Sequence, residues 1–151
     1  MKVALDTNFL AYAEGVNGAD RRAVALDLMK RLPAGSAVIP VQVLGELFNV
    51  VVRKAGRSRD AAREALQGWR DAFPVADTTA EAMQTAVDLA TDHKLGIWDA
   101  VILSVSSQAG CRLLLSEDLQ EGRTWGGVTV VNPFAATRHT LLEALLSDAD
   151  Q

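Results

Sequence analysis

The stretch Lys2-Val3-Ala4-Leu5-Asp6-Thr7-Asn8 decides how this chain begins to fold. Its apolar run is too short for a helix and stops abruptly at Asp6, which is typical of a strand buried on both faces. A helix is expected to begin directly afterwards, with Thr7 or Asn8 as its cap. Buried strands of this kind occur in parallel sheets that are covered by helices. The start of the chain therefore predicts a strand, a polar turn and a helix.

The rest of the chain repeats this alternation of short apolar runs and helix-length segments. Further strands are expected over 36–39, 75–77, 112–115 and 128–131, and helices over 20–32, 40–56, 58–73, 79–93, 97–109 and around 141–146. The alternation predicts an α/β fold, a three-layer α/β/α sandwich with a mainly parallel central sheet of about four or five strands.

The chain shows no internal repeat, low-complexity stretch or linker. We expect one domain over residues 1–134, with 135–151 as a C-terminal helix that packs on the same domain or lies at an interface. Its leucines either close the core or form a partner surface, and the sequence leaves both open; they are Leu141, Leu142, Leu145 and Leu146. In the helix over 79–93 the inward stripe is expected to be Met83, Val87 and Ala90.

Cysteine and histidine usage excludes two kinds of stabilising site. The chain has one cysteine, Cys111, and two histidines, His93 and His139. One cysteine forms no disulfide within a chain, and these three residues do not make up a usual zinc site. Cys111 is expected to pack as a small apolar residue. An intracellular, cytoplasmic location is expected, because Asp6 and Asn8 interrupt any secretory signal and no apolar run is long enough for a membrane helix.

The charge balance argues against nucleic-acid binding by bulk positive charge. The 151 residues include 15 Lys and Arg against 19 Asp and Glu, for a net charge of −4, whereas nucleic-acid-binding domains usually carry a basic face. Only eight aromatic residues are present (four Phe, three Trp and one Tyr), and Trp98 is expected in the core. A nucleic-acid role would therefore depend on a local site.

Four acidic residues stand where such a site is expected. Asp6 and Asp118 follow strands, and ligands of open α/β sheets bind beyond the carboxyl ends of the strands. Glu46 and Asp99 lie on apolar helix faces, with no Lys or Arg three or four residues away. A buried carboxylate needs a cationic partner, and a set of oxygen ligands favours Mg²⁺ or Mn²⁺.

Five stretches, taken in their order, resemble the PIN domain nucleases and, within them, the VapC-like toxins of toxin–antitoxin pairs. The ordered set is far more specific than any one of its motifs. It covers nearly the whole chain and consists of Leu5-Asp6-Thr7-Asn8, Leu44-Gly45-Glu46-Leu47, Trp98-Asp99-Ala100, Leu115-Ser116-Glu117-Asp118-Leu119-Gln120 and Asn132-Pro133-Phe134.

The resemblance implies an endoribonuclease that cuts RNA with metal-activated water and leaves 5′-phosphate and 3′-hydroxyl ends. It implies that a small antitoxin covers the site and that the protein is a homodimer. The implied catalytic residues and ligands of Mg²⁺ or Mn²⁺ are Asp6, Glu46, Asp99 and Asp118, and the implied supporting residues are Thr7, Asn8 and Ser116. Glu117 is expected to be peripheral. Without the four site acids, the 15 remaining acids equal the 15 Lys and Arg, so RNA binding is expected to depend on divalent metal.

Ordinary structural roles stand beside these functional ones. Asp6 could be a simple helix cap, Asp99 could be held by a helix dipole, and Glu46 could be solvated. A basic cluster could follow an RNA backbone or form a solvated helix end; it comprises Arg53, Lys54, Arg57, Arg59 and Arg63.

Other functions also remain open at this stage. The chain could be a catalytically inactive PIN-like binding module. An aspartyl-phosphate phosphatase would need a second Asp two residues after Asp6, where this chain has Asn8. A receiver-like signalling module would need a late Lys that residues 128–134 lack.

Overall fold

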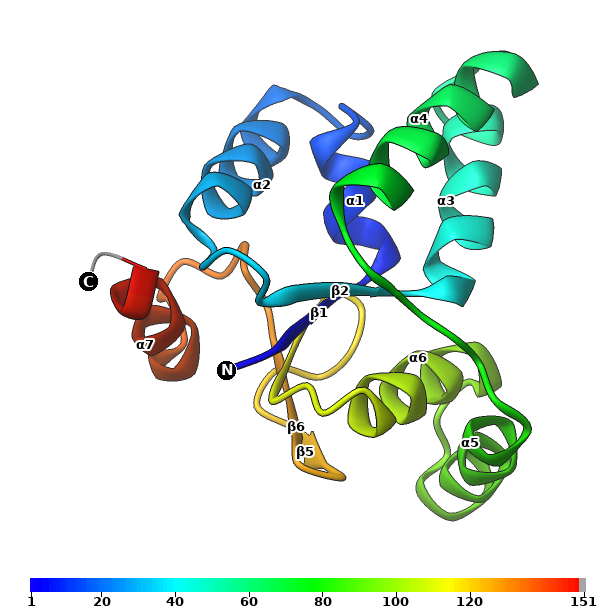
Figure 1. Ribbon diagram of the computed structural model, residues 1–151, viewed down its shortest axis with the longest axis vertical. Coiled ribbons are helices and arrows are strands. Elements are labelled where there is room, and N and C mark those ends of the chain that lie inside the picture. The colour runs from blue at the N-terminus through cyan, green and yellow to red at the C-terminus, as the bar shows by residue number, and fades with distance from the viewer. Residues whose placement is uncertain (150–151) are drawn as a thin grey trace.

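In the computed structural model, which describes residues 1–149, six strands form one sheet in the order β3-β2-β1-β4-β6-β5 (Figure 1). All neighbouring strands are parallel except the edge pair β5–β6. The strands are β1 (Val3–Leu5), β2 (Ala37–Pro40), β3 (Val75–Ala76), β4 (Leu113–Leu115), β5 (Thr124–Trp125) and β6 (Val128–Val131). The α/β prediction is confirmed, and five of the six strands were expected. Only β5 was missed.

The strand order reverses between β1 and β4. From β1 the chain builds outward through β2 and β3, and it then returns to the other side of β1 to form β4. The register pairs Leu5 with Leu115, and the backbone N–H of Asp6 donates to the carbonyl of Leu115 over 3.1 Å. Consequently, the polar segments that follow β1 and β4 lie next to each other at the point where ligands bind in open α/β sheets.

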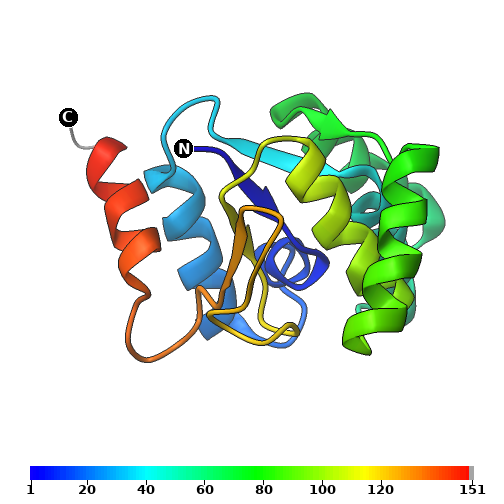
Figure 2. The same ribbon diagram turned by 90° about the horizontal axis from the view of Figure 1, so that it is seen from below.

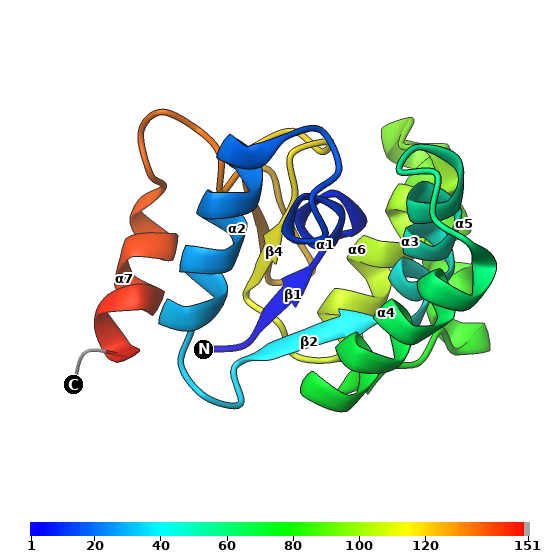
Figure 3. The ribbon, with the colours of Figure 1, turned by 90° about the horizontal axis from the view of Figure 1, so that it is seen from above.

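Seven helices surround the sheet within residues 1–149. Figure 1 shows α1 to α4 on one side of β2 and α5 with α6 on the other, and Figures 2 and 3 show α7 beside α2. The helices are α1 (Thr7–Ala13), α2 (Ala19–Arg31), α3 (Val41–Arg53), α4 (Arg59–Ala72), α5 (Ala80–His93), α6 (Ile97–Gln108) and α7 (Thr140–Ala149). The expected three layers are therefore present.

The inward face of α5 differs from the expected stripe. The buried residues are Ala82, Ala86 and Leu89, whereas Val87 is 44% exposed. The physical reason is close packing on α6: the Ser104 hydroxyl, itself buried, donates to the carbonyl of Ala82 over 2.9 Å. The alanines on this face of α5 allow that close approach. Because alanine is only weakly hydrophobic, the spacing of the larger apolar residues did not predict which face is buried.

The C-terminal helix contributes to the core. Leu142, Leu145 and Leu146 of α7 are at most 2% exposed, and Leu141 is partly buried against them. The leucines thus close the core, which decides between the two alternatives left by the sequence. Residues 150–151 of the expected C-terminal segment lie outside the described residues.

The expectation that Cys111 packs as a small apolar residue is confirmed. Cys111 is buried and free, and burial raises the pKa of its thiol to about 11. The Nδ1 atom of His139 accepts a hydrogen bond from the backbone N–H of Leu141 at the start of α7. No helix within residues 1–149 has the length and apolar character needed to cross a membrane.

Candidate active site

Asp6 lies at the centre of the site, at the carboxyl end of β1, and is 3% exposed. It is the N-cap of α1, and its Oδ1 accepts a hydrogen bond from the N–H of Thr7 at 2.7 Å. Its Oδ2 accepts one from the Ser116 hydroxyl at 2.6 Å. Burial, together with the negative charges of Glu46 and Asp118, raises the pKa of Asp6 to about 6 despite these two bonds. The capping role is confirmed, and the ionised carboxylate is unfavourable in this position.

Glu46 reaches the same region from the middle of α3 and is half-buried. The hydroxyl of Thr7 donates to its Oε2, and the amide of Gln42 donates to its Oε1 over 2.9 Å. Gln42 precedes Glu46 by one helical turn, so both side chains leave the same face of α3. These two bonds fix the direction of the carboxylate.

Asp99 lies in the first turn of α6 and is also half-buried. The N-cap of this helix is Gly96, so Asp99 is not the capping residue. Burial raises the pKa of Asp99, and the charges of Asp118 and Glu46 add to that effect. The same two carboxylates thus raise the pKa of both Asp6 and Asp99, and neither aspartate forms an ion pair with Lys or Arg within residues 1–149.

Asp118 is carried by the loop that follows β4. Its side chain is exposed, but its backbone is held by Ser116, which is fully buried. The Ser116 hydroxyl oxygen accepts hydrogen bonds from the N–H groups of Asp118 at 3.2 Å and Leu119 at 3.4 Å. Since the same hydroxyl donates to Asp6, Ser116 links the ends of β1 and β4.

A cleft of about 390 Å³ opens beside Glu46 and Asp118. Its lining comes from α1, α3, the residues that follow these helices, and Asp118, and includes Thr7, Asn8, Asn49 and Lys54. Asp6, Asp99 and Ser116 are not among the lining residues. Lys54 brings a positive charge to the cleft that also holds two of the carboxylates. Of the expected supporting residues, Thr7 and Asn8 line the cleft and Ser116 contacts Asp6, and their supporting role stays a prediction.

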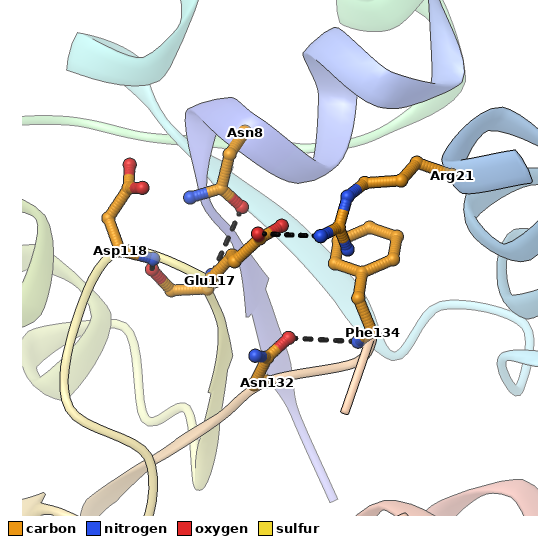
Figure 4. A network of polar contacts seen from close by, with 7 residues as sticks. Asn8, Arg21, Glu117, Asp118, Asn132 and Phe134 are labelled. Carbon is orange, nitrogen blue, oxygen red and sulfur yellow. Dashed lines mark hydrogen bonds and ion pairs between the residues drawn. The ribbon is translucent and has the colours of Figure 1, made fainter. Parts of the chain in front are cut away.

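A second network holds the loop that carries Asp118, and Figure 4 shows it. Arg21 of α2 forms an ion pair with Glu117 over 3.0 Å, and its guanidinium lies 5.2 Å from the ring centroids of both Tyr12 and Phe134. The backbone N–H of Glu117 donates to Oδ1 of Asn8 over 3.2 Å. Glu117 is not among the residues that line the cleft, and its contacts tie the loop to α1 and α2.

The arrangement of the four acids has one limit. Within residues 1–149, no group of three or more His, Cys, Asp or Glu side chains is placed so that it could hold one metal ion. The chemistry of the donors nevertheless fits Mg²⁺ or Mn²⁺, because all four are carboxylates and none of them forms an ion pair with Lys or Arg within residues 1–149. The four-ligand set stays a prediction.

The basic cluster divides into residues with different roles. Arg57 forms an ion pair of 2.7 Å with Glu14, which also accepts a hydrogen bond from the indole N–H of Trp69. Arg57 thus joins the segment between α3 and α4 to the end of α1, and Trp69 joins α4 itself to the same carboxylate. Arg63 pairs with Asp60, and Arg53 and Arg59 are exposed. Lys54 is the member of the cluster that lines the cleft.

The expectation for Trp98 is wrong. It is 58% exposed, because it lies in the first turn of α6, ahead of the buried run that begins at Ala100. Sequence reasoning also missed Gln42 and Asn49, although both lie one turn from Glu46 on the same helix and could have been found from that spacing. Nothing in the sequence pointed to the pairing of Arg21 with Glu117.

Comparison with known proteins identifies the family. The PIN domain model matches residues 3–121, and this chain belongs to the PIN domain family, whose members are ribonucleases. No match was found among curated proteins.

Several solved structures share the fold. VapC20 of Mycobacterium tuberculosis, a sarcin-ricin loop cleaving toxin, is 24% identical over 78% of this chain and 90% of its own, with a TM-score of 0.66. A toxin–antitoxin complex from Klebsiella pneumoniae is 21% identical over 88% of this chain and 98% of that one, with a TM-score of 0.65. PAE2754 from Pyrobaculum aerophilum is 18% identical over 99% and 96%, with a TM-score of 0.62.

Proposed function

We propose that this protein is a divalent-metal-dependent endoribonuclease that hydrolyses phosphodiester bonds of RNA. The observation that carries the proposal is the gathering of acidic side chains at the β1–β4 switch point. Ser116 links the buried Asp6 to the loop that carries Asp118, and Thr7, which follows Asp6, donates to Glu46. Glu46 and Asp118 both raise the pKa values of Asp6 and Asp99, and none of the four carboxylates forms an ion pair with Lys or Arg within residues 1–149. A cation bound there would relieve this repulsion. Membership of the PIN family supports the same chemistry.

Asp6, Glu46, Asp99 and Asp118 would hold Mg²⁺ or Mn²⁺. Such an ion, when bound, lowers the pKa of a coordinated water and neutralises charge on the phosphodiester. The chain itself orients the ligands: Ser116 and the N–H of Thr7 hold the two oxygens of Asp6, and the Thr7 hydroxyl directs Glu46. Lys54 lies in the same cleft and would attract a phosphate of the substrate.

The biological role that we propose is that of a toxin in a type II toxin–antitoxin pair, acting in the cytoplasm as a homodimer. The support is the shared fold with VapC20 and with the toxin–antitoxin complex from Klebsiella pneumoniae. A small antitoxin would cover the acidic cleft. A short reading frame for an antitoxin-like protein should lie directly upstream of the gene, and coexpression with its product should yield a copurifying complex. The absence of such a frame, or of any complex, would argue against this role.

Cleavage assays test the nuclease proposal. The purified protein should cut RNA in Mg²⁺ or Mn²⁺ and lose activity in EDTA, and the products should carry 5′-phosphates. Asp6→Asn and Asp99→Asn should abolish cleavage. Asp77→Asn provides a matched control, because Asp77 also follows a strand, β3, but is exposed and lies outside the cleft.

Two outcomes would contradict the proposal. Equal cleavage by wild type and both site variants would reject the site. A metal titration that detects no Mg²⁺ or Mn²⁺ binding would instead favour a catalytically inactive binding module.

A further inference from the structure

Trp98 is the most exposed large hydrophobic residue of the described chain, with 58% of its surface accessible. Indole surface is costly to leave in water, and tryptophan usually buries most of its area. The residue next to it, Asp99, belongs to the candidate active site. An exposed indole that immediately precedes an active-site acid in the chain therefore indicates a surface that binds a ligand.

The indole lines an open groove of about 580 Å³ between α3 and the start of α6. Its lining residues are Val41, Gln42, Gly45, Glu46, Asn49 and Trp98. Glu46 and Asn49 also line the cleft that contains Thr7, Lys54 and Asp118. The groove and the cleft therefore adjoin along α3, with the Glu46 carboxylate at their boundary.

One amide fixes this geometry. The side-chain N–H₂ group of Gln42 donates to Oε1 of Glu46 over 2.9 Å and to the backbone carbonyl of Trp98 over 3.1 Å. Both of its hydrogens are thereby used, while its Oε1 remains an acceptor. Gln42 thus holds the backbone of Trp98 in a fixed position relative to the carboxylate of Glu46.

We propose that this groove is a nucleobase subsite, in which one base of the RNA, adjacent to the phosphate at the acids, stacks on the indole of Trp98. The inference rests on the proposed ribonuclease function and adds a determinant of substrate choice. Base–aromatic stacking suits any base, because every base has a π-face. The amides of Gln42 and Asn49 lie in the same groove and can contact the edge of the base.

Two features favour a base over a protein partner. Half of the lining residues are polar (Gln42, Glu46 and Asn49), whereas the apolar residues are confined to Val41 and Trp98, and the buried centre of a protein interface is depleted of charge. The protein also has a net charge of −4. Stacking supplies affinity for RNA that does not depend on positive charge, and this chain has no excess of positive charge.

The test uses full-length protein and a single-stranded oligoribonucleotide in which 2-aminopurine replaces one base at a time. Stacking on the indole should quench its fluorescence at one position next to the cleavage point. Trp98→Ala should abolish that quenching, weaken binding roughly 5- to 100-fold and raise KM more than it lowers kcat. Trp98→Phe should retain most of the affinity. Val87→Ala is the control, since Val87 is exposed but lies in neither the groove nor the cleft.

Each contrary result has a separate meaning. If Trp98→Ala binds and cuts RNA as wild type does, the subsite is rejected while the ribonuclease function stands. If this variant changes the sedimentation of the protein but not its RNA affinity, the groove is an interface between copies of the chain, and the subsite is again rejected. If wild-type protein neither binds nor cuts RNA, the proposed function fails and the subsite fails with it. Should Trp98→Ala not fold, the position-specific quenching by wild type and its reduction in Trp98→Phe decide the question.

Discussion

Replacing Asp6 with Asn should stabilise the metal-free protein at neutral pH, although it removes a central residue of the site. Burial and the neighbouring carboxylates raise the pKa of Asp6 from 3.8 to about 6. At 1.36 kcal/mol per pKa unit, the ionised group at neutral pH opposes folding by roughly 3 kcal/mol. Asn keeps the acceptor for the N–H of Thr7 but not the acceptor for the Ser116 hydroxyl, which costs ~1 kcal/mol. The net gain is about 2 kcal/mol.

The sign of the effect depends on pH. Because the pKa of Asp6 is higher in the folded state, its contribution to stability is fully present below pH 3.8 and is lost as the pH rises through about 6. Below pH 3.8 the variant should therefore be the less stable protein, by ~1 kcal/mol for the lost hydrogen bond. Above about pH 7 it should be the more stable one.

Urea unfolding in EDTA between pH 3 and pH 8 measures this difference for wild type, Asp6→Asn and the control Asp77→Asn. Subtracting the two unfolding free energies removes the titration of all other groups. Adding Mg²⁺ should then raise the stability of wild type more than that of Asp6→Asn. A difference between wild type and Asp6→Asn that does not change with pH would refute the reasoning, and so would a variant that loses relative stability as the pH rises.

Three further substitutions test separate parts of the structure. Lys54→Ala should weaken RNA binding and reduce its dependence on salt by about one phosphate contact in a salt titration. Arg57→Ala should leave that slope unchanged and lower the free energy of unfolding by ~2 kcal/mol, because it removes the ion pair between the segment before α4 and Glu14 at the end of α1. Arg21→Met should lower the free energy of unfolding in urea by ~1 kcal/mol, because it removes the ion pair with Glu117. It should also increase the Mg²⁺ concentration needed for half-maximal cleavage, and Arg21→Lys should partly restore the wild-type value. An unchanged Mg²⁺ requirement would show that the loop carrying Asp118 holds its position without the ion pair. Leu145→Ala should lower the unfolding free energy by about 2–5 kcal/mol, and an unaffected stability would mean that α7 is not part of the cooperative core.

Four of the five strands that could be predicted from the sequence are buried on both faces, and the fifth, β3, is partly buried. β1, β2, β4 and β6 are short apolar runs with polar ends, and every residue in them is buried. β5 escaped because it has two residues and pairs with β6 through a turn at Gly126 and Gly127, both with positive φ. Such a hairpin edge has too few residues to show a period.

Helix ends and side-chain exposure were harder to predict. α5 ends at His93 as expected, although the left-handed residue that follows it is Lys94 rather than a glycine. α3 ends at Arg53, three residues before its expected end at position 56. Trp98 was assigned to the core from its apolar character, but exposure depends on where a helix begins relative to the sheet.

The site was predictable only in part, for a physical reason. Glu46 and Asp99 stood out because charges on apolar helix faces require partners, and Asp6 and Asp118 stood out because they follow strands, where open α/β sheets bind ligands. The ion pair between Arg21 and Glu117 joins segments 96 residues apart, and neither residue carries a local pattern. The packing of α2 on α1 creates this contact, so it becomes visible only in three dimensions.

The hydrogen bond from Ser116 to Asp6 spans 110 residues of the chain and has a consequence for protein synthesis. The first half of the chain supplies Asp6 and Glu46, and the second supplies Asp99 and Asp118. Contacts so distant in sequence form late, after much of the chain has left the ribosome. A nascent chain that ends before β4 holds Asp6 without the hydroxyl that orients it. The four acids are therefore brought together only after most of the chain has been translated.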